Sequence, residues 1–88
     1  MEVVVTLQSE NFSRDFALPA DVKLGDLYPR LLKALQNASS ARFGDWRGVI
    51  LETEEGAFTD LEATLTDYGV YTGKYLNLSE EDWNDGIG

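Results

Sequence analysis

The sequence predicts a small α+β domain in which a mixed β-sheet is covered on one face by a single helix. Two observations support this prediction. Short stretches that alternate apolar and polar residues, as half-buried strands do, lie on both sides of one segment with apolar residues at helical spacing. A helix with one apolar stripe must bury that stripe against another element, and the strands supply the sheet. The expected order of elements is β-β-α-β-β-β.

The first two elements are predicted to form a hairpin. Residues 2–8 alternate as a strand, residues 12–18 form a second strand, and Ser9, Glu10 and Asn11 between them favour a turn. In the first strand Val4 and Thr6 fall on the face opposite the apolar residues. The residues expected on the apolar face of the hairpin are Met1, Val3, Val5, Leu7, Phe12, Phe16 and Leu18.

A helix is predicted at residues 26–38, with Leu27 and Leu31 on its apolar stripe. Pro29 determines where the helix begins, because proline has no N–H and clashes with the carbonyl four residues earlier. With Asp26 as the N-cap, Pro29 is the third helical residue, where no intrahelical acceptor is needed. A start at Leu24 would require a kink.

Three more strands are predicted at residues 46–52, 57–59 and 75–78, and the remainder, residues 79–88, forms an acidic tail that extends past the core. The domain is therefore expected to span residues 1–78. The residues predicted to be buried together are Val3, Val5, Leu18, Leu27, Leu31, Val49, Leu51, Leu65, Leu76 and Leu78.

Composition excludes several classes of function. The 88 residues contain no Cys and no His, so the commonest general base and the usual soft and nitrogen metal ligands are missing. The whole net charge of −9 lies in residues 48–88, which hold ten acids and one base. A negative field disfavours nucleic acid and anionic membrane and can steer a basic partner. We expect no cofactor, no metal, no catalysis and no membrane insertion. The first residues are typical of a strand and not of a signal peptide, which favours a cytoplasmic protein.

Several strings resemble ubiquitin and its β-grasp fold: the opening strand at Met1, the corner Leu18-Pro19-Ala20-Asp21, and the run Thr64-Leu65-Thr66-Asp67-Tyr68-Gly69-Val70 with the strand Tyr75-Leu76-Asn77-Leu78 after it. Within this superfamily the chain is similar to the YukD/EsaB-like proteins of type VII (ESX-type) secretion. Those proteins have a proline near the helix start, here Pro29, and an aromatic–basic pair that opens the third strand, here Trp46-Arg47. The resemblance covers about residues 1–78, and the acidic tail departs from it.

The resemblance implies a non-catalytic ubiquitin-fold regulator that docks to components of a secretion machinery. It also implies that Tyr68 packs its ring and hydrogen-bonds a loop backbone. Turn chemistry favours Asp67 as the cap of the same turn. Two alternatives stay open: a ubiquitin-like modifier and a ubiquitin-fold module of an unrelated assembly. Conjugation requires a free Gly-Gly ending, whereas Ile87 separates Gly86 from Gly88 here.

The candidate binding surface is the sheet face that points away from the helix. Ubiquitin-fold proteins commonly bind partners through this face, where an exposed Ile is the anchor, and the resemblance places Ile50 at that position. By alternation the protein-binding residues are Val4, Thr6, Ile50, Tyr75 and Asn77, with the acids of residues 52–62 as a charged rim. Trp83 is expected either to fold back on the domain or to anchor a contact made by the tail.

Overall fold

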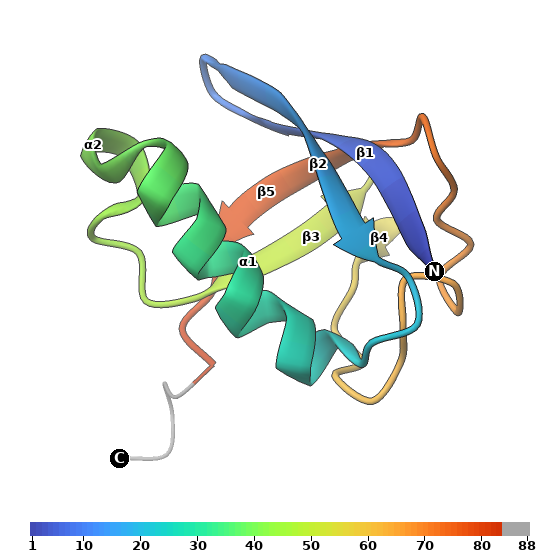
Figure 1. Cartoon of the computed structure of the whole chain (residues 1–88). Coiled ribbons are helices and arrows are strands. Elements are labelled where there is room, and N and C mark those ends of the chain that lie inside the picture. Colours follow the sequence, from blue (N-terminus) through green and yellow to red (C-terminus); the bar gives the residue numbers. More distant parts are fainter. Residues whose placement is uncertain (84–88) are drawn as a thin grey trace.

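The structure is a computed structural model, and it describes residues 1–83. Figure 1 shows a hairpin, a long helix, a very short helix and three further strands in chain order. The elements are β1 (Glu2–Ser9), β2 (Phe12–Pro19), α1 (Leu24–Ala38), α2 (Ser40–Phe43), β3 (Val49–Thr53), β4 (Gly56–Ala57) and β5 (Tyr75–Glu80). The predicted α+β class is confirmed, and α2 is an additional element that the sequence pattern did not predict.

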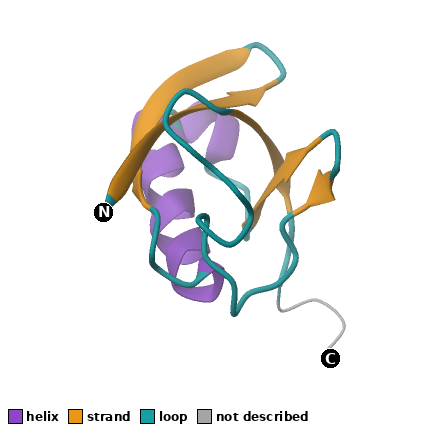
Figure 2. Cartoon of the chain, turned by 90° about the vertical axis from the view of Figure 1, so that its right-hand side faces the viewer, coloured by secondary structure: helices purple, strands orange, loops and turns teal. Residues whose placement is uncertain are grey.

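The strands form one mixed sheet in the order β2-β1-β5-β3-β4. β1 pairs antiparallel with β2 and parallel with β5, and β5 pairs antiparallel with β3. The apolar β1 and β5 therefore lie inside the sheet. Figures 1 and 2 show α1 lying across one face of the twisted sheet, so this face is the inner face and the opposite one is the outward face.

The predicted helix start at Asp26 is wrong, because α1 begins at Leu24 and no side chain caps its first turn. The loop before β5 satisfies the first amides instead. Leu24 N–H donates to Ala63 O at 2.8 Å, and Gly25 N–H donates to Leu61 O at 2.9 Å. A Cβ on Gly25 would lie 3.3 Å from Leu61 O, so glycine permits this close approach. Pro29 consequently lies inside the helix.

All ten residues predicted to be buried together are in one apolar cluster between α1 and the sheet. That cluster also contains Leu24, Tyr28 and Phe43, which the sequence analysis did not assign to it. The Tyr28 hydroxyl lies in the cluster, donating to Phe58 O at 2.7 Å and accepting from Leu51 N–H at 3.3 Å. Burial raises the pKa of Tyr28 from its ordinary 10.0 to about 12, because the charged phenolate is disfavoured away from water.

All five strands differ from their predicted bounds. β1 and β2 each end one residue later than predicted, and β4 covers Gly56–Ala57 instead of residues 57–59. The larger differences are in β3 and β5. β3 begins at Val49 and not at Trp46, because Trp46 N–H bonds back to Phe43 O in the turn after α2. β5 continues to Glu80, two residues beyond its predicted end and into the predicted tail.

Residues 81–83 continue beside the start of β3. Glu81 N–H donates to Gly48 O at 3.1 Å, and the Trp83 Nε1–H donates to Val49 O at 3.0 Å. The Trp83 ring stacks on Tyr28 with its centroid 5.8 Å away. Trp83 therefore folds back on the domain, the first of its two predicted roles, whereas the Gly86–Gly88 ending lies outside the described residues.

Candidate docking surface

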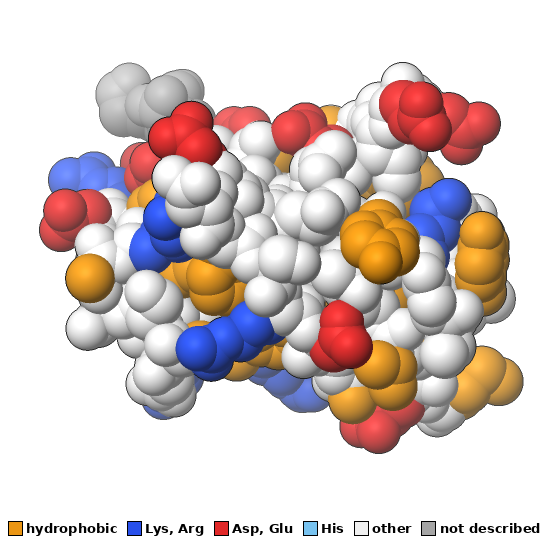
Figure 3. Space-filling view, turned by 90° about the horizontal axis from the view of Figure 1, so that it is seen from above, with side chains coloured by type: hydrophobic (Ala, Val, Ile, Leu, Met, Phe, Trp, Pro, Cys, Tyr) orange, Lys and Arg blue, Asp and Glu red, His pale blue; other side chains and the backbone are white. Residues whose placement is uncertain are grey.

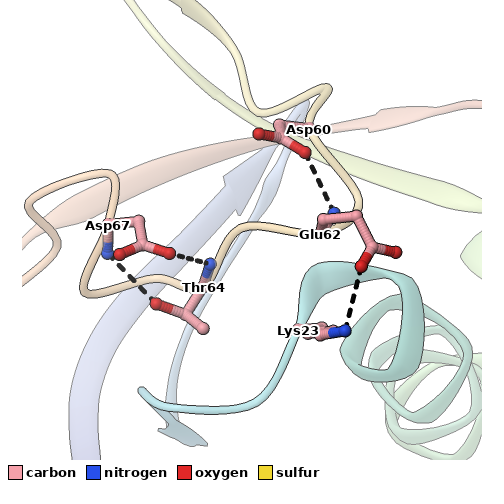
Figure 4. Close-up of polar contacts among 5 residues, drawn as sticks. All are labelled: Lys23, Asp60, Glu62, Thr64 and Asp67. Carbon is pink, nitrogen blue, oxygen red and sulfur yellow. Dashed lines mark hydrogen bonds and ion pairs between the residues drawn. The ribbon is translucent and has the colours of Figure 1, made fainter.

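A hydrogen-bonded turn fixes the segment that leads into β5. Thr64 N–H donates to Asp67 Oδ2 at 2.9 Å, and Asp67 N–H donates to Thr64 Oγ1 at 3.1 Å, so each side chain caps the other's backbone (Figure 4). The Tyr68 hydroxyl accepts from Asp60 N–H at 3.0 Å, and its ring stacks on Phe58. The roles predicted for Asp67 and Tyr68 are confirmed.

Polar contacts also connect the loop at residues 60–62 to the residue before α1. Asp60 Oδ1 accepts from Glu62 N–H at 3.0 Å, and the Glu62 carboxylate pairs with Lys23 Nζ at 2.9 Å (Figure 4). This contact raises the pKa of Lys23, chiefly through the hydrogen bond to Glu62. Both side chains are solvent-exposed, so the pair is a weak contact that screening by salt reduces further.

The strand register brings four of the five predicted binding residues together on the outward face. Thr6 lies opposite Tyr75 across the β1–β5 pair, and Asn77 follows two residues after Tyr75 on the same side. Val4 precedes Thr6 on that side, and 44% of its surface is exposed. Thr6 itself is half-buried and donates through its hydroxyl to Asp15 Oδ1 at 2.7 Å.

The expectation that Ile50 is an exposed anchor is wrong, because its side chain is 4% exposed. Ile50 pairs with Ser79, near the end of β5, whereas the residue of β3 that lies opposite Asn77 is Glu52. Ile50 instead belongs to the apolar core cluster. Alternation gives the side of the sheet that a residue faces, and it does not tell whether other parts of the chain cover the residue there.

Tyr71 is a surface residue that the sequence analysis missed as part of this site. Its side chain is 61% exposed and that of Tyr75 is 63% exposed. The segment next to Tyr71 is tied to β1, since Thr72 Oγ1 accepts from Val4 N–H at 3.1 Å. Tyr71 lies in a turn, so no strand alternation could assign it to this face. We call Val4, Tyr71 and Tyr75 the tyrosine patch.

Carboxylates lie beside the tyrosine patch. Glu52, Glu54 and Glu55 line a shallow, open depression together with Tyr75, Asn77 and Lys74. Figure 3 shows hydrophobic side chains gathered toward the end of the molecule where β1 begins, with acidic side chains around them. An exposed apolar centre with a charged rim is the usual anatomy of a protein interface.

A separate groove of about 370 Å³ lies on the helix side of the molecule. Trp83 forms one wall and Tyr28, Pro29, Leu32 and Leu61 contribute to the others. Trp83 thus belongs to this groove and not to the tyrosine patch.

Among residues 1–83, no group of three or more His, Cys, Asp or Glu side chains could hold a metal ion. No helix in the same part of the chain is long and apolar enough to cross a membrane. The carboxylates at the depression are Glu52, which accepts from Ser79 Oγ at 2.6 Å, and the exposed Glu54 and Glu55. The arrangement offers surface for binding and no buried pair of acid–base groups.

The fold and the outward face together define a ubiquitin-like β-grasp protein. The profile of one family, described as "WXG100 protein secretion system (Wss), protein YukD", matches residues 2–78. The chain therefore belongs to the YukD family, as its sequence resemblance predicted.

Solved structures show the same fold in parts of type VII secretion systems. The ubiquitin-like domain of the Mycobacterium tuberculosis type VII secretion system protein EccD1 matches with a TM-score of 0.75 at 20% identity, over 91% of this chain and 99% of that one. The EccD5 ubiquitin-like domain from Mycobacterium xenopi matches with a TM-score of 0.74 at 21% identity, over 93% of this chain and 97% of that one.

A third match comes from a larger assembly and has a lower TM-score. Protomer 1 of the ESX-3 core complex contains a domain that matches with a TM-score of 0.62 at 29% identity, and this chain covers 16% of that one. A search of curated protein sequences finds no significant match.

Proposed function

We propose that this chain is a non-catalytic accessory protein of a bacterial type VII secretion system that acts in the cytoplasm by docking to components of the machinery. Membership of the YukD family together with the exposed tyrosine patch on an unpartnered sheet face supports the proposal. Related ubiquitin-like domains occur in an ESX-5 inner membrane complex and in the ESX-3 core complex, which favours membrane-complex components as partners.

Docking through the outward face near Val4, Thr6, Tyr75 and Asn77 is part of the proposal. Val4 and Tyr75 supply exposed apolar area on adjacent strands, and Asn77 supplies an exposed amide beside them. Exposed aromatic side chains at the centre of a patch are the residues that most often dominate binding energy. Ile50 is not part of the proposed surface.

The test is a titration of the purified chain with soluble domains of the secretion-system components encoded in the same genome, followed by calorimetry. Tyr75→Ala should weaken binding by about tenfold or more if the side chain is a central anchor. Arg30→Ala, an exposed change on α1, is the control and should leave the affinity unchanged within about twofold. If Arg30→Ala weakens binding and Tyr75→Ala does not, docking occurs through the helix; if no component binds, the proposed function is wrong.

A further inference from the structure

We infer that the tyrosine patch and the carboxylates beside it bind a partner segment that carries lysine or arginine side chains next to apolar ones. This inference rests on the proposed docking function and specifies the chemistry of the partner. It comes from three features of the outward face: exposed aromatic surface, an excess of carboxylates, and a cation already held against one of the rings.

The aromatic surface is the first feature. The Tyr71 and Tyr75 rings are each more than half exposed, and Val4 lies beside the residues that connect them, since it bonds to Thr72 and Gly73. Rings of this kind cover the methylene stems of lysine and arginine and attract their charged ends. They therefore bind long basic side chains as well as purely apolar ones.

The charge of the same face is the second feature. Glu2 and Asp15 lie on the outward side of the hairpin by register, and Glu52, Glu54 and Glu55 line the neighbouring depression. Lys74 is the one base among the residues that line this depression. An acidic partner or a phosphate-rich one would meet repulsion here, whereas a basic segment would be steered toward the patch.

The position of Lys74 is the third feature. Its Nζ lies 5.4 Å from the centroid of the Tyr71 ring, within the range of a cation–π contact. The ring thus already attracts a cation from within the chain. A basic side chain of a partner would find the same kind of site at the Tyr75 ring, which Glu52 and Asn77 flank in the depression.

The test uses two short peptides, one in which lysine alternates with leucine and one in which glutamate replaces each lysine. The lysine peptide should shift the amide resonances of Val4, of residues 52–55 and of residues 71–77, whereas the glutamate peptide should not. Raising the salt concentration from about 50 to about 300 mM should weaken binding of the lysine peptide severalfold, because salt shortens the range over which exposed charges interact. Binding of both peptides with equal affinity would overturn the inference.

Matched variants separate a specific site from general charge attraction. The double variant Glu54→Lys, Glu55→Lys should bind the lysine peptide about tenfold more weakly. The pair Glu10→Lys and Asp45→Lys makes the same change in net charge at exposed positions outside the patch and should weaken it by less than about twofold. Equal losses in the two pairs would mean that net charge alone attracts the peptide, and would overturn the inference.

The two proposals fail in different ways. If secretion-system components bind through Tyr75 and the charge reversal at Glu54 and Glu55 has no effect on them, the docking function stands and the basic-partner inference is wrong. If the lysine peptide binds at the patch but no secretion-system component binds the chain, the proposed function is wrong and the chemistry of the patch stands.

Discussion

The two ends of the outward sheet face differ in how far their side chains are exposed to solvent. The same alternation along the strands turns the side chains outward at both ends. Near the start of β5, Val4 and Tyr75 are 44% and 63% exposed. Near the end of β5, Ile50 faces the same side by register but is 4% exposed. The strand period determines which side of the sheet a residue faces, and the neighbouring chain determines whether water reaches it.

The chain that follows β5 lies beside the residues that precede Ile50. Residues 80–83 run beside residues 47–49: Arg47 N–H donates to the Glu80 carboxylate at 3.3 Å, and Glu81 and Trp83 bond to Gly48 and Val49. A Cβ on Gly48 would lie 2.0 Å from Glu81 O, so this close approach depends on glycine. The end of the face around Val4 and Tyr75 is the more exposed one, which is why the proposed docking surface is placed there.

The largest effect is expected from an arginine at the buried end. Ile50→Arg should destabilise the domain by about 3 kcal/mol or more, because it replaces a buried apolar side chain with an unpaired charge. Tyr75→Arg, on the same face at the exposed end, should change stability by less than about 0.5 kcal/mol. Chemical denaturation of both variants measures the difference. If Ile50→Arg is as stable as Tyr75→Arg, the two ends do not differ.

An intermediate effect is expected from Trp83. Trp83→Ala should destabilise the domain by about 1–3 kcal/mol, because it removes the stacking on Tyr28 and the Nε1–H bond to Val49 O. Trp83→Phe keeps a ring and loses the Nε1–H donor, so this variant should lose less stability than Trp83→Ala. Melting curves check the order. Equal stability of the wild type and Trp83→Ala would show that residues 81–83 do not belong to the folded unit.

The smallest effect on stability is expected from removing one tyrosine hydroxyl, either at the buried Tyr28 or at the exposed Tyr75. Tyr28→Phe should cost about 1–2 kcal/mol near neutral pH, because Phe58 O and Leu51 N–H lose a buried partner. Tyr75→Phe should have almost no effect on stability. Urea titrations of the two variants measure the difference, and equal losses would contradict the assignment of Tyr28 to the core.

The raised pKa of Tyr28 adds a dependence on pH. Its folded value of about 12 lies above its ordinary value of 10.0, so the folded state holds the proton more tightly. This contribution to stability is complete below pH 10.0 and is lost as the pH rises toward about 12. Tyr28→Phe should therefore lose less stability than the wild type over that interval, and a parallel loss would contradict the prediction.

The local sequence determined the element types, their order, most of the core and the turn around Asp67 and Tyr68. Alternation and helical spacing can be read from residues that are close together in the sequence. They place residues such as Val5, Leu31 and Leu76 on the apolar face of their strand or helix. The caps exchanged by Thr64 and Asp67 lie three residues apart, so they too are readable from the sequence. All five predicted binding residues face one side of the sheet for the same reason, although Ile50 is buried there.

Only the tertiary structure decided the start of α1, the burial of Ile50 and the inclusion of Tyr71 in the patch. The first amides of α1 bond to the carbonyls of Leu61 and Ala63, far away in the chain, so no side-chain cap marks the start. Tyr71 approaches β1 through a contact between Thr72 and Val4, which are separated by 68 positions. Such contacts depend on how distant segments meet, and a local period carries no information about that.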